Sequence, residues 1–295
     1  MPNVYFDFFD IADDTRRQRI FEGDIFLSSA LSSVTSLCDF AKSMIEEAFF
    51  PADPQEAQFH LAVEEFINII GPLKSRFTNH GRTKELVRNV ISEFGGDLDR
   101  TYFDVPRLRV VTHGGYLTAG VGYAYRPHRD IWYASPTSQV NWWTPVYRLE
   151  AERALSLYPN YWGRRVQNSS REFDYDEWCR IGRQQAASQI ESDTRRHPLA
   201  EEEISTDGEL RPVCDAGAMI SFSSAQLHAT AANTSGLTRF SLDFRTLHLD
   251  DLESGTGAHN VDSAATGTTL GDFISVSNFS ALPTELIRSA SLVNK

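Results

Sequence analysis

Residues 218–245 read AMISFSSAQLHATAANTSGLTRFSLDFR, and this stretch decides the fold. An apolar, strand-like run leads to His228, a turn follows at residues 233–236, and a second strand-like run carries Arg239 and Arg245. A histidine at the end of one strand and an arginine eleven positions later on the neighbouring strand would lie close together. The stretch therefore predicts antiparallel strands with polar side chains gathered beside them.

Segments upstream of this stretch have the same strand character. They are short and rich in β-branched and aromatic residues, and several alternate with period two, which favours strands over helices. They read LRVV, LTAGVGYAY and SQVNWWTPVY and cover residues 108–111, 117–125 and 138–147. Together with residues 218–224 and 238–249, they predict a β core over residues 106–250.

The first hundred residues have helical spacing instead. Residues 32–50 carry apolar side chains three and four positions apart, which is the pattern of an amphipathic helix. Further helices are predicted at 54–70, with Gly71 and Pro72 as the stop signal, and at 83–94. Helices packed beside an antiparallel β core define an α+β fold.

The chain is predicted to form a single domain over residues 1–295. Residues 1–105 are its mainly helical part, and residues 106–250 are the β core. A polar insertion at 150–209, with a helix at about 175–192, interrupts the core and would serve as a lid. Residues 251–295 form a tail rich in small residues, whose apolar segment at 274–287 is expected to fold back onto the body.

Composition and charge exclude several classes of protein. The net charge of -12 argues against nucleic acid or an anionic membrane as a partner, because either needs a basic surface. The acidic N-terminus lacks the features of a signal peptide, and no apolar run reaches membrane-spanning length, so a cytoplasmic location is expected. The three cysteines have no C-x-x-C spacing, which indicates neither a disulfide framework nor a thiolate zinc site.

Residues 125–133 read YRPHRDIWY and place His128 and Asp130 two positions apart. On an extended segment these side chains point to the same face and can reach one cation, whereas Arg129 points to the opposite face. An ordinary polar strand with an internal ion pair is the alternative. With His228 as a third ligand, two histidines and one carboxylate would leave open positions on an octahedral iron. The six other histidines lack ligand spacing.

Further polar and aromatic residues are candidates for the same cavity. Tyr123 and Tyr125 share the side-chain parity of His128, and Asn141 is the candidate for a polar contact on the next strand. In the insertion, NYWGRRVQNSS offers Arg164, Arg165 and Asn168, which would either hold a polar substrate or form a solvated loop.

His128-x-Asp130, His228 a hundred positions later and Arg239 at the H-x10-R spacing together resemble the iron(II)/2-oxoglutarate-dependent oxygenases. Within that family the chain is most similar to the phytanoyl-CoA dioxygenase-like branch, which commonly has Ser or Thr two positions after the distal histidine. Thr230 occupies that position here. The resemblance covers roughly residues 107–248 and, more loosely, EGDIFLSSALSS at 22–33, but neither the insertion nor the tail.

The resemblance implies a double-stranded β-helix, or jelly roll, with the metal between its two sheets. It assigns Fe(II) to His128, Asp130 and His228, and the cosubstrate 2-oxoglutarate to Arg239 and Thr230, with Asn141 as a further contact. Such enzymes consume dioxygen, release succinate and carbon dioxide, and oxidise a small molecule, here an amino acid derivative or natural-product intermediate. Because related halogenases have Gly or Ala in place of the carboxylate, the Asp favours hydroxylation or another oxidation.

Two other functions remain open at this point. A cupin-like metal enzyme that does not use 2-oxoglutarate would share the barrel and the metal but would leave Arg239 and Thr230 without a role. A jelly-roll protein that binds a ligand without turnover would not need the metal ligands. Arg245 is expected to pair with Asp243 structurally, although contact with the cosubstrate or with an acidic substrate is the alternative.

Overall fold

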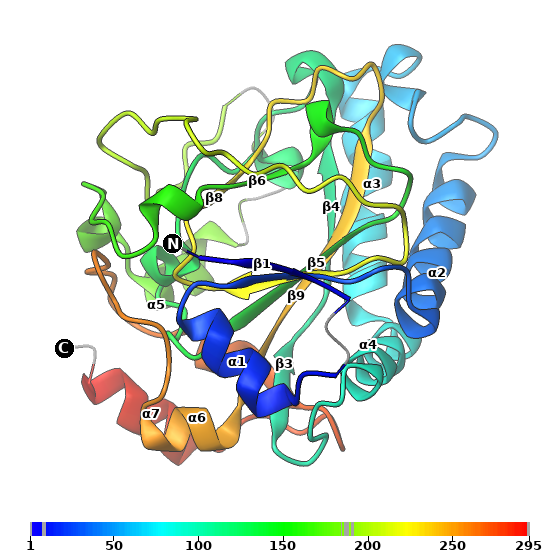
Figure 1. Ribbon diagram of the computed structural model, residues 1–295. Coiled ribbons are helices and arrows are strands. Elements are labelled where there is room, and N and C mark those ends of the chain that lie inside the picture. Colours follow the sequence, from blue (N-terminus) through cyan, green and yellow to red (C-terminus); the bar gives the residue numbers. More distant parts are fainter. Residues whose placement is uncertain (1, 8–9, 184, 186–188, 190–191, 294–295) are drawn as a thin grey trace.

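The computed structural model describes residues 2–7, 10–183, 185, 189 and 192–293, and its centre is a large sheet beside a small one. The large sheet has the order β1-β2-β7-β5-β9-β3-β10, with β4 also paired to β9, and the small sheet joins β6 to β8 (Figure 1). The strands are β1 (Val4–Phe6), β2 (Ile25–Leu27), β3 (Thr101–Asp104), β4 (Arg107–Val111), β5 (Val140–Pro145), β6 (Leu155–Leu157), β7 (Ile220–Ser223), β8 (His228–Thr230), β9 (Arg239–His248) and β10 (Phe273–Ser275).

The long strand β9 organises the large sheet. One edge pairs with β5 from Ser241 to Thr246, and the other edge pairs first with β4 and then with β3. Val105 and Pro106 separate β3 from β4, since a proline cannot donate to the ladder. At this break the Asp104 carboxylate accepts the backbone N–H of Arg245 at 2.6 Å, so that the hydrogen bond lost from the ladder is replaced.

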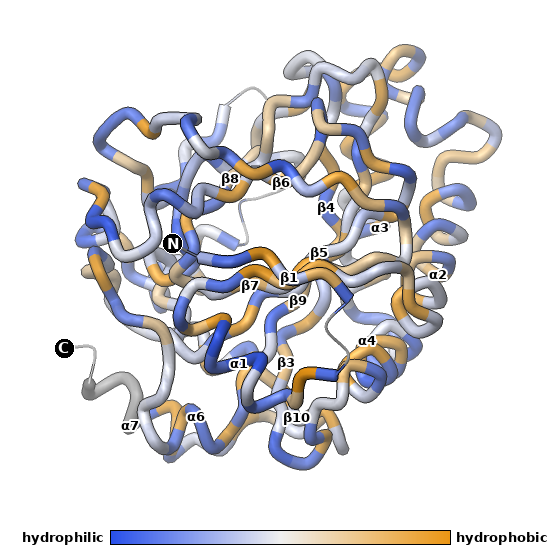
Figure 2. The backbone as a smooth tube through the Cα atoms, in the orientation of Figure 1, coloured by the Kyte–Doolittle hydropathy of each residue, from blue (hydrophilic) through white to orange (hydrophobic). Residues whose placement is uncertain are grey.

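The helices lie outside the sheets. They are α1 (Asp13–Phe21), α2 (Ser32–Phe49), α3 (Val63–Asn79), α4 (Gly81–Glu93), α5 (Tyr175–Glu177), α6 (Leu249–Ser254) and α7 (Thr284–Val293). Figure 1 shows α2, α3 and α4 grouped on one side of the β core. In Figure 2 the apolar segments concentrate in the strands and on the inner faces of these helices. The α+β prediction, with helices packed beside a β core, is therefore confirmed.

The helix predicted at 54–70 is wrong in its bounds. Residues 57–59 form a short 3-10 turn, and the helix begins at Val63, where Glu65 accepts the N–H of Ala62 at 2.9 Å. It runs through Gly71 and Pro72 to Asn79. Its buried face continues past the proline with Leu73 and Phe77, and burying each such side chain contributes about 1.5–3 kcal/mol, which offsets the cost of a helical proline of about 3 kcal/mol.

Two further sequence expectations need correction. The strand predicted at 117–125 is a loop with a 3-10 turn at Gly120–Gly122, where Gly120 has a φ of 58° that a strand does not allow. The insertion is not wholly outside the core, because β6 lies within it and pairs with β8. The helix predicted at 175–192 begins with α5, which continues as a π-helical turn over Trp178–Gly182. Part of the remaining predicted range lies outside the described residues.

The tail folds back onto the body as predicted. Strand β10 pairs antiparallel with β3 and extends the large sheet. Nearer the start of the tail, the buried Asp262 carboxylate accepts three hydrogen bonds. The donors are Arg129 Nε at 3.1 Å, Trp132 Nε1 at 2.7 Å and the N–H of Val166 at 3.0 Å. The guanidinium of Arg129 also donates to the carbonyls of Tyr161 and Arg164, at 2.9 and 2.8 Å. One ion pair thus joins the tail, the insertion and the segment that carries His128.

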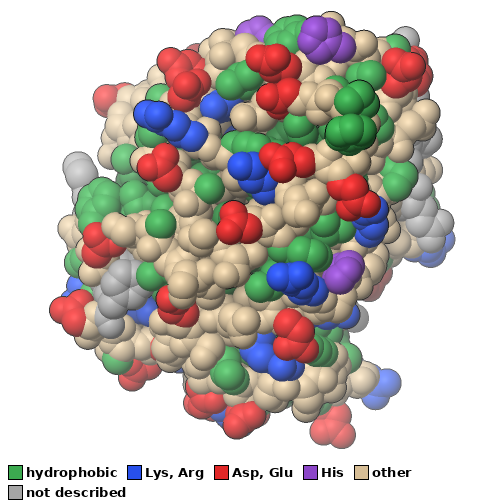
Figure 3. Space-filling model, turned by 90° about the vertical axis from the view of Figure 1, so that its right-hand side faces the viewer, with side chains coloured by type: hydrophobic (Ala, Val, Ile, Leu, Met, Phe, Trp, Pro, Cys, Tyr) green, Lys and Arg blue, Asp and Glu red, His purple; other side chains and the backbone are tan. Residues whose placement is uncertain are grey.

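The two sheets give the layered arrangement expected of a jelly roll, although hydrogen bonding does not close them into one barrel. A reciprocal bridge between His128 and His228 adds one residue pair to the small sheet. The side of the molecule that carries α2, shown in Figure 3, mixes acidic, basic and apolar side chains without a large patch of one kind. No helix in the described part of the chain has the length and apolar character needed to cross a membrane.

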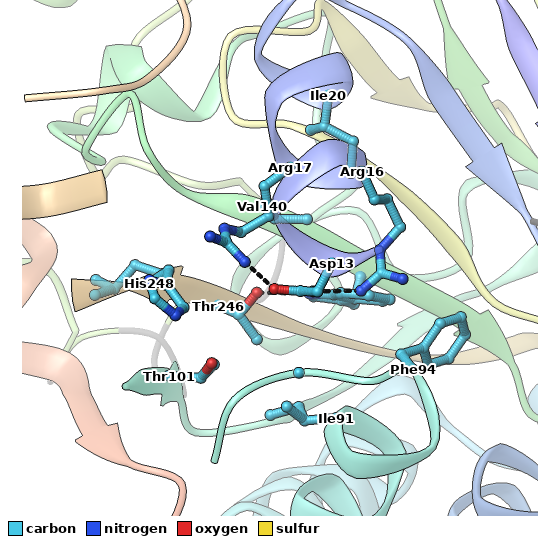
Figure 4. Close-up of a pocket in the computed structure, with 13 residues that line it drawn as sticks. Asp13, Arg16, Arg17, Ile20, Ile91, Phe94, Thr101, Val140, Thr246 and His248 are labelled. Atoms are coloured by element: carbon cyan, nitrogen blue, oxygen red, sulfur yellow. Dashed lines mark hydrogen bonds and ion pairs between the residues drawn. The ribbon is translucent and has the colours of Figure 1, made fainter. Parts of the chain in front are cut away.

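Helix α1 covers the face of the large sheet that lies away from the small sheet. Figure 4 shows Asp13 between the guanidinium groups of Arg16 and Arg17, and Arg17 also pairs with Asp251 at 2.6 Å. The cavity left beneath the helix measures about 20 Å³, room for roughly one water molecule. This face of the sheet is therefore a packed interface, and the space for a ligand lies on the other face.

We predict that Arg129→Ala lowers the free energy of unfolding by about 3–5 kcal/mol, because it leaves the Asp262 carboxylate buried and without its cation. Urea denaturation measures the loss. Arg165→Ala is the matched control, since Arg165 is exposed, and it should change the unfolding free energy by less than about 0.5 kcal/mol. Equal effects of the two substitutions would contradict the structural role of Arg129.

Candidate metal centre

Three buried side chains from two separate stretches of sequence meet between the sheets. His128 precedes the short 3-10 turn that opens at Asp130, and His228 is the first residue of β8. The Asp130 Oδ1 lies 3.4 Å from His128 Nε2 and 3.6 Å from His228 Nε2, and the three ligand atoms all lie within 4.8 Å of one another. Within the part of the chain that is described, no other group of three such residues could hold a metal ion.

Backbone hydrogen bonds fix the two histidines opposite each other. The N–H of His128 donates to the carbonyl of His228 and the N–H of His228 donates to the carbonyl of His128, each at 2.9 Å. This is the closely bonded pair of an antiparallel ladder, in which both side chains lie on the same face. The ring centroids are consequently 4.3 Å apart. Arg129 between the ligands is extended, so Asp130 returns to the same face as His128, as alternation predicts.

A second set of hydrogen bonds orients the imidazole rings. His128 Nδ1 lies 2.8 Å from the carbonyl of Arg126, and His228 Nδ1 lies 2.9 Å from the carbonyl of Gln226. A carbonyl can only accept, so each Nδ1 carries the proton and each Nε2 presents its lone pair toward Asp130. Metal-binding histidines are commonly held in this way, because the bond at one nitrogen selects the tautomer that coordinates through the other.

The Asp130 carboxylate is held in its ionised form. Burial raises its pKa, but Arg245 and the two imidazoles outweigh burial, and the net pKa lies well below the usual range. The Oδ2 atom accepts from Gln139 Nε2 at 3.1 Å and lies 3.5 Å from Arg245 Nε, which leaves Oδ1 facing the histidines. Burial and the neighbouring His128 lower the pKa of His228 to about 4, so this imidazole is neutral at pH 7.

These donors fit a divalent transition metal. Two neutral imidazole nitrogens and one carboxylate oxygen, on one side of a common point, form the set that suits iron and leaves other coordination positions free. The ionised Asp130 carboxylate and the two Nε2 lone pairs face a common point, where a cation would be attracted and bound. The residues present therefore fit the Fe(II) that the sequence resemblance implies.

The metal centre opens into a cavity of about 350 Å³. Five of the residues predicted to lie in the pocket line it, namely Tyr123, Tyr125, Asn141, Thr230 and Arg239. Asn141 is connected to the centre through Gln139, whose Nε2 also donates to Asn141 Oδ1 at 2.8 Å. The cavity lies within the size range of small-molecule sites.

Arg239 is buried in the cavity wall with an incomplete set of partners. Its Nη1 donates to the carbonyls of Arg153 and Ala154 at 3.0 and 3.2 Å, while its buried Nε has no hydrogen-bond partner among the described residues. Burial and the nearby Arg109 lower the pKa of this guanidinium to about 10, although it remains charged at pH 7. A buried guanidinium held only by neutral carbonyls is a site for an anion.

Arg245 makes the ion pair with Asp243 that was favoured from the sequence, at 3.1 Å. It also reaches Asp104 at 3.3 Å and Asp130 at 3.5 Å. Its charge is therefore compensated by three carboxylates, unlike that of Arg239. Arg245 also lines the cavity and contributes to the low pKa of Asp130.

The residues proposed from the insertion do not reach the cavity. Arg164 and Arg165 are exposed. Asn168 is buried, and its side-chain amide donates to the carbonyls of Val166 and Asp262. Of the two interpretations, solvated loop or substrate contact, the loop is the one that fits the two arginines.

Sequence reasoning missed several residues of the cavity. Gln139 stands two positions before Asn141 and shares its strand face, so alternation could have identified it. Tyr133 also lines the cavity, at the end of the 3-10 turn that begins at Asp130. Trp178 and Lys74 line it too, but no spacing relates them to the metal centre. The positions of these two depend on how the insertion and α3 pack against the sheets.

No family model matches this sequence, and no curated protein matches it. Solved structures of similar fold include EvdO2 from Micromonospora carbonacea var. aurantiaca in complex with 2-oxoglutarate, with 12% identity over 81% of this chain and 92% of that chain and a TM-score of 0.44. They also include EctD from S. alaskensis with bound Fe, with 12% identity, 81% and 78% coverage and a TM-score of 0.41.

The non-heme alpha ketoglutarate dependent epimerase SnoN from nogalamycin biosynthesis is a further similar structure, with 10% identity, 80% and 84% coverage and a TM-score of 0.38. None of these neighbours distinguishes the phytanoyl-CoA dioxygenase-like branch. At such identities and TM-scores the function of this chain has to be argued from its own site.

We predict that Gln139→Met weakens divalent metal binding about tenfold or more, because Asp130 Oδ2 loses a donor that orients the carboxylate. Competition between the protein and a chromophoric chelator for Fe(II) or Co(II) measures the dissociation constant. Gln167→Met, at an exposed position outside the cavity, should leave that constant unchanged. Equal affinities for the Gln139 variant and the unmodified protein would rule out this role.

Proposed function

We propose that this chain is an Fe(II)/2-oxoglutarate-dependent oxygenase that hydroxylates, or otherwise oxidises, a small molecule with release of succinate and carbon dioxide. The observation that carries the proposal is the presence, in one cavity, of a buried His-Asp-His group and a buried arginine that lacks an anionic partner. The first feature fits a metal with open positions, and the second fits the far carboxylate of a dicarboxylic acid bound to that metal.

In this proposal, His128, Asp130 and His228 hold Fe(II), and iron with 2-oxoglutarate supplies the oxidising power for breaking a C–H bond when both are bound. Arg239 binds the carboxylate of 2-oxoglutarate that does not touch the metal, with Thr230 beside it on the cavity wall. Gln139 and Arg245 keep Asp130 oriented and ionised. Asn141 is a further polar contact for the cosubstrate.

Aromatic side chains enclose the open side of the metal centre. The Tyr125 ring lies 5.1 Å from the ring of His128, the Tyr133 ring lies 5.5 Å from it, and Tyr123 stacks on His197 at 4.1 Å. These rings offer apolar surface to a substrate beside the metal centre.

Titration of the Fe(II) protein with 2-oxoglutarate without oxygen is the test of this function. We expect the weak visible charge-transfer band of the chelate, and we expect Asp130→Ala to abolish turnover because it removes a metal ligand. Metal binding without the band would favour the cupin-like alternative. Failure to bind metal would favour a jelly-roll binding protein without turnover.

A second prediction concerns the cosubstrate anchor. Arg239→Ala should raise the concentration of 2-oxoglutarate required for half-saturation about 10–100-fold, since it removes a charge-assisted hydrogen bond in a buried site. The same anaerobic titration gives the concentration, and Arg165→Ala is the control. If Arg239→Ala has no effect while Arg245→Ala raises the requirement, the assignment of the anchor is wrong.

A further inference from the structure

One half-buried cation of the cavity, Lys74, has no role in the proposed function. Lys74 lies in α3, and its ammonium group reaches the cavity between Arg109 and the loop at residues 120–122. Its Nζ donates to the backbone carbonyl of Val121, and no carboxylate of the described residues lies within ion-pair distance. The side chain keeps some accessible surface, as expected of a group that lines a cavity in the interior.

The neighbouring cations are compensated, whereas Lys74 is not. Arg109 holds Asp243 with two hydrogen bonds, of 2.6 and 3.1 Å. Arg195 pairs with Asp193 through its Nε at 2.8 Å, and both of these side chains are buried. Each guanidinium therefore has a carboxylate partner, whereas the Lys74 ammonium has none among the described residues.

The charged form of Lys74 is costly in the absence of a ligand. Burial, with Arg109 second, lowers the pKa of Lys74 to about 7 from its ordinary value near 10.5. An apolar side chain at this helix position would avoid that cost. A lysine is nevertheless expected at such a position if a bound anion compensates its charge and so offsets the loss of stability.

A continuous wall leads from the metal centre to Lys74. The centroid of the Tyr125 ring lies 5.1 Å from that of the His128 ring. The guanidinium carbon of Arg109 lies 5.2 Å from the same Tyr125 centroid. Arg109 in turn is the cation that lowers the pKa of Lys74 most. Tyr123 meets Tyr125 edge to face at 4.9 Å and widens this aromatic surface.

We propose that Lys74 binds the carboxylate of the primary substrate, a small organic acid whose apolar or ring-bearing body lies along Tyr125 and Tyr123 and reaches the metal centre. This inference rests on the proposed function and adds the substrate class to it. Arg239 keeps the cosubstrate, so the two anions occupy different parts of the cavity. A single ammonium group suits a carboxylate, because a phosphate group has more oxygens and more charge to satisfy.

Ring-bearing carboxylic acids and their neutral amides test the proposal. The pairs are phenylacetate with phenylacetamide, hydrocinnamate with hydrocinnamamide, and cyclohexanecarboxylate with cyclohexanecarboxamide. Calorimetry on the Fe(II) protein saturated with 2-oxoglutarate, without oxygen, gives both dissociation constants of each pair. We expect at least one carboxylate to bind about tenfold or more tightly than its amide, as a charge-assisted hydrogen bond provides. Equal binding of acid and amide in all three pairs overturns the proposal.

The variants assign the preference to Lys74. Lys74→Met should reduce the preference for the carboxylate to within about twofold, and Lys74→Gln, which can still donate to the carbonyl of Val121, should do the same. Lys42→Met is the matched control, because Lys42 lies on α2 with a side chain that is 46% exposed. A preference that persists in both Lys74 variants overturns the proposal.

The cosubstrate band separates this inference from the proposed function. Both Lys74 variants should give the charge-transfer band at the same 2-oxoglutarate concentration as the unmodified protein. If the band requires much more 2-oxoglutarate in these variants while the preference for the acid is unchanged, Lys74 binds the cosubstrate and the inference fails. Absence of the band from the unmodified protein instead refutes the proposed function.

Discussion

The reciprocal backbone hydrogen bonds between His128 and His228 are the constraint on which the site depends. They join two segments a hundred residues apart and set the spacing of two imidazoles with no contribution from the side chains. The carbonyls of Arg126 and Gln226, each two residues before a histidine, then turn both rings in the same way. The geometry of the centre is thus a property of the main chain, and the side chains supply only the donor atoms.

Charge compensation distinguishes the parts of the cavity. Arg245 pairs with Asp104, Asp243 and Asp130 and lowers the pKa of Asp130, and Arg109 shares Asp243 with it. Arg239 and Lys74 instead have only backbone carbonyls as hydrogen-bond partners among the described residues. The two cations without carboxylates mark where two anions can bind, one for the cosubstrate and one for the proposed substrate acid.

The sequence was most informative where a local pattern determines the outcome. The spacing of His128, Asp130, His228 and Arg239 predicted a set of residues that the structure brings to one cavity, because strand alternation and a short turn control their directions. The pattern failed at α3, where the buried face outweighs Pro72. It could not identify Lys74, whose position on the cavity follows from the packing of α3 on β4 and from no local signal.

The pairing of β9 also bears on how the chain folds during synthesis. Strands β3, β4 and β5 all form their ladders with β9, which the ribosome makes only after residues 146–238 have followed. Until then these strands present unpaired backbone groups beside apolar side chains, which is the situation that favours association with other chains. Contacts of such long sequence separation also slow folding. Expression at low temperature, or with additional chaperones, is therefore expected to improve the yield of folded protein more than changes at the molecular surface would.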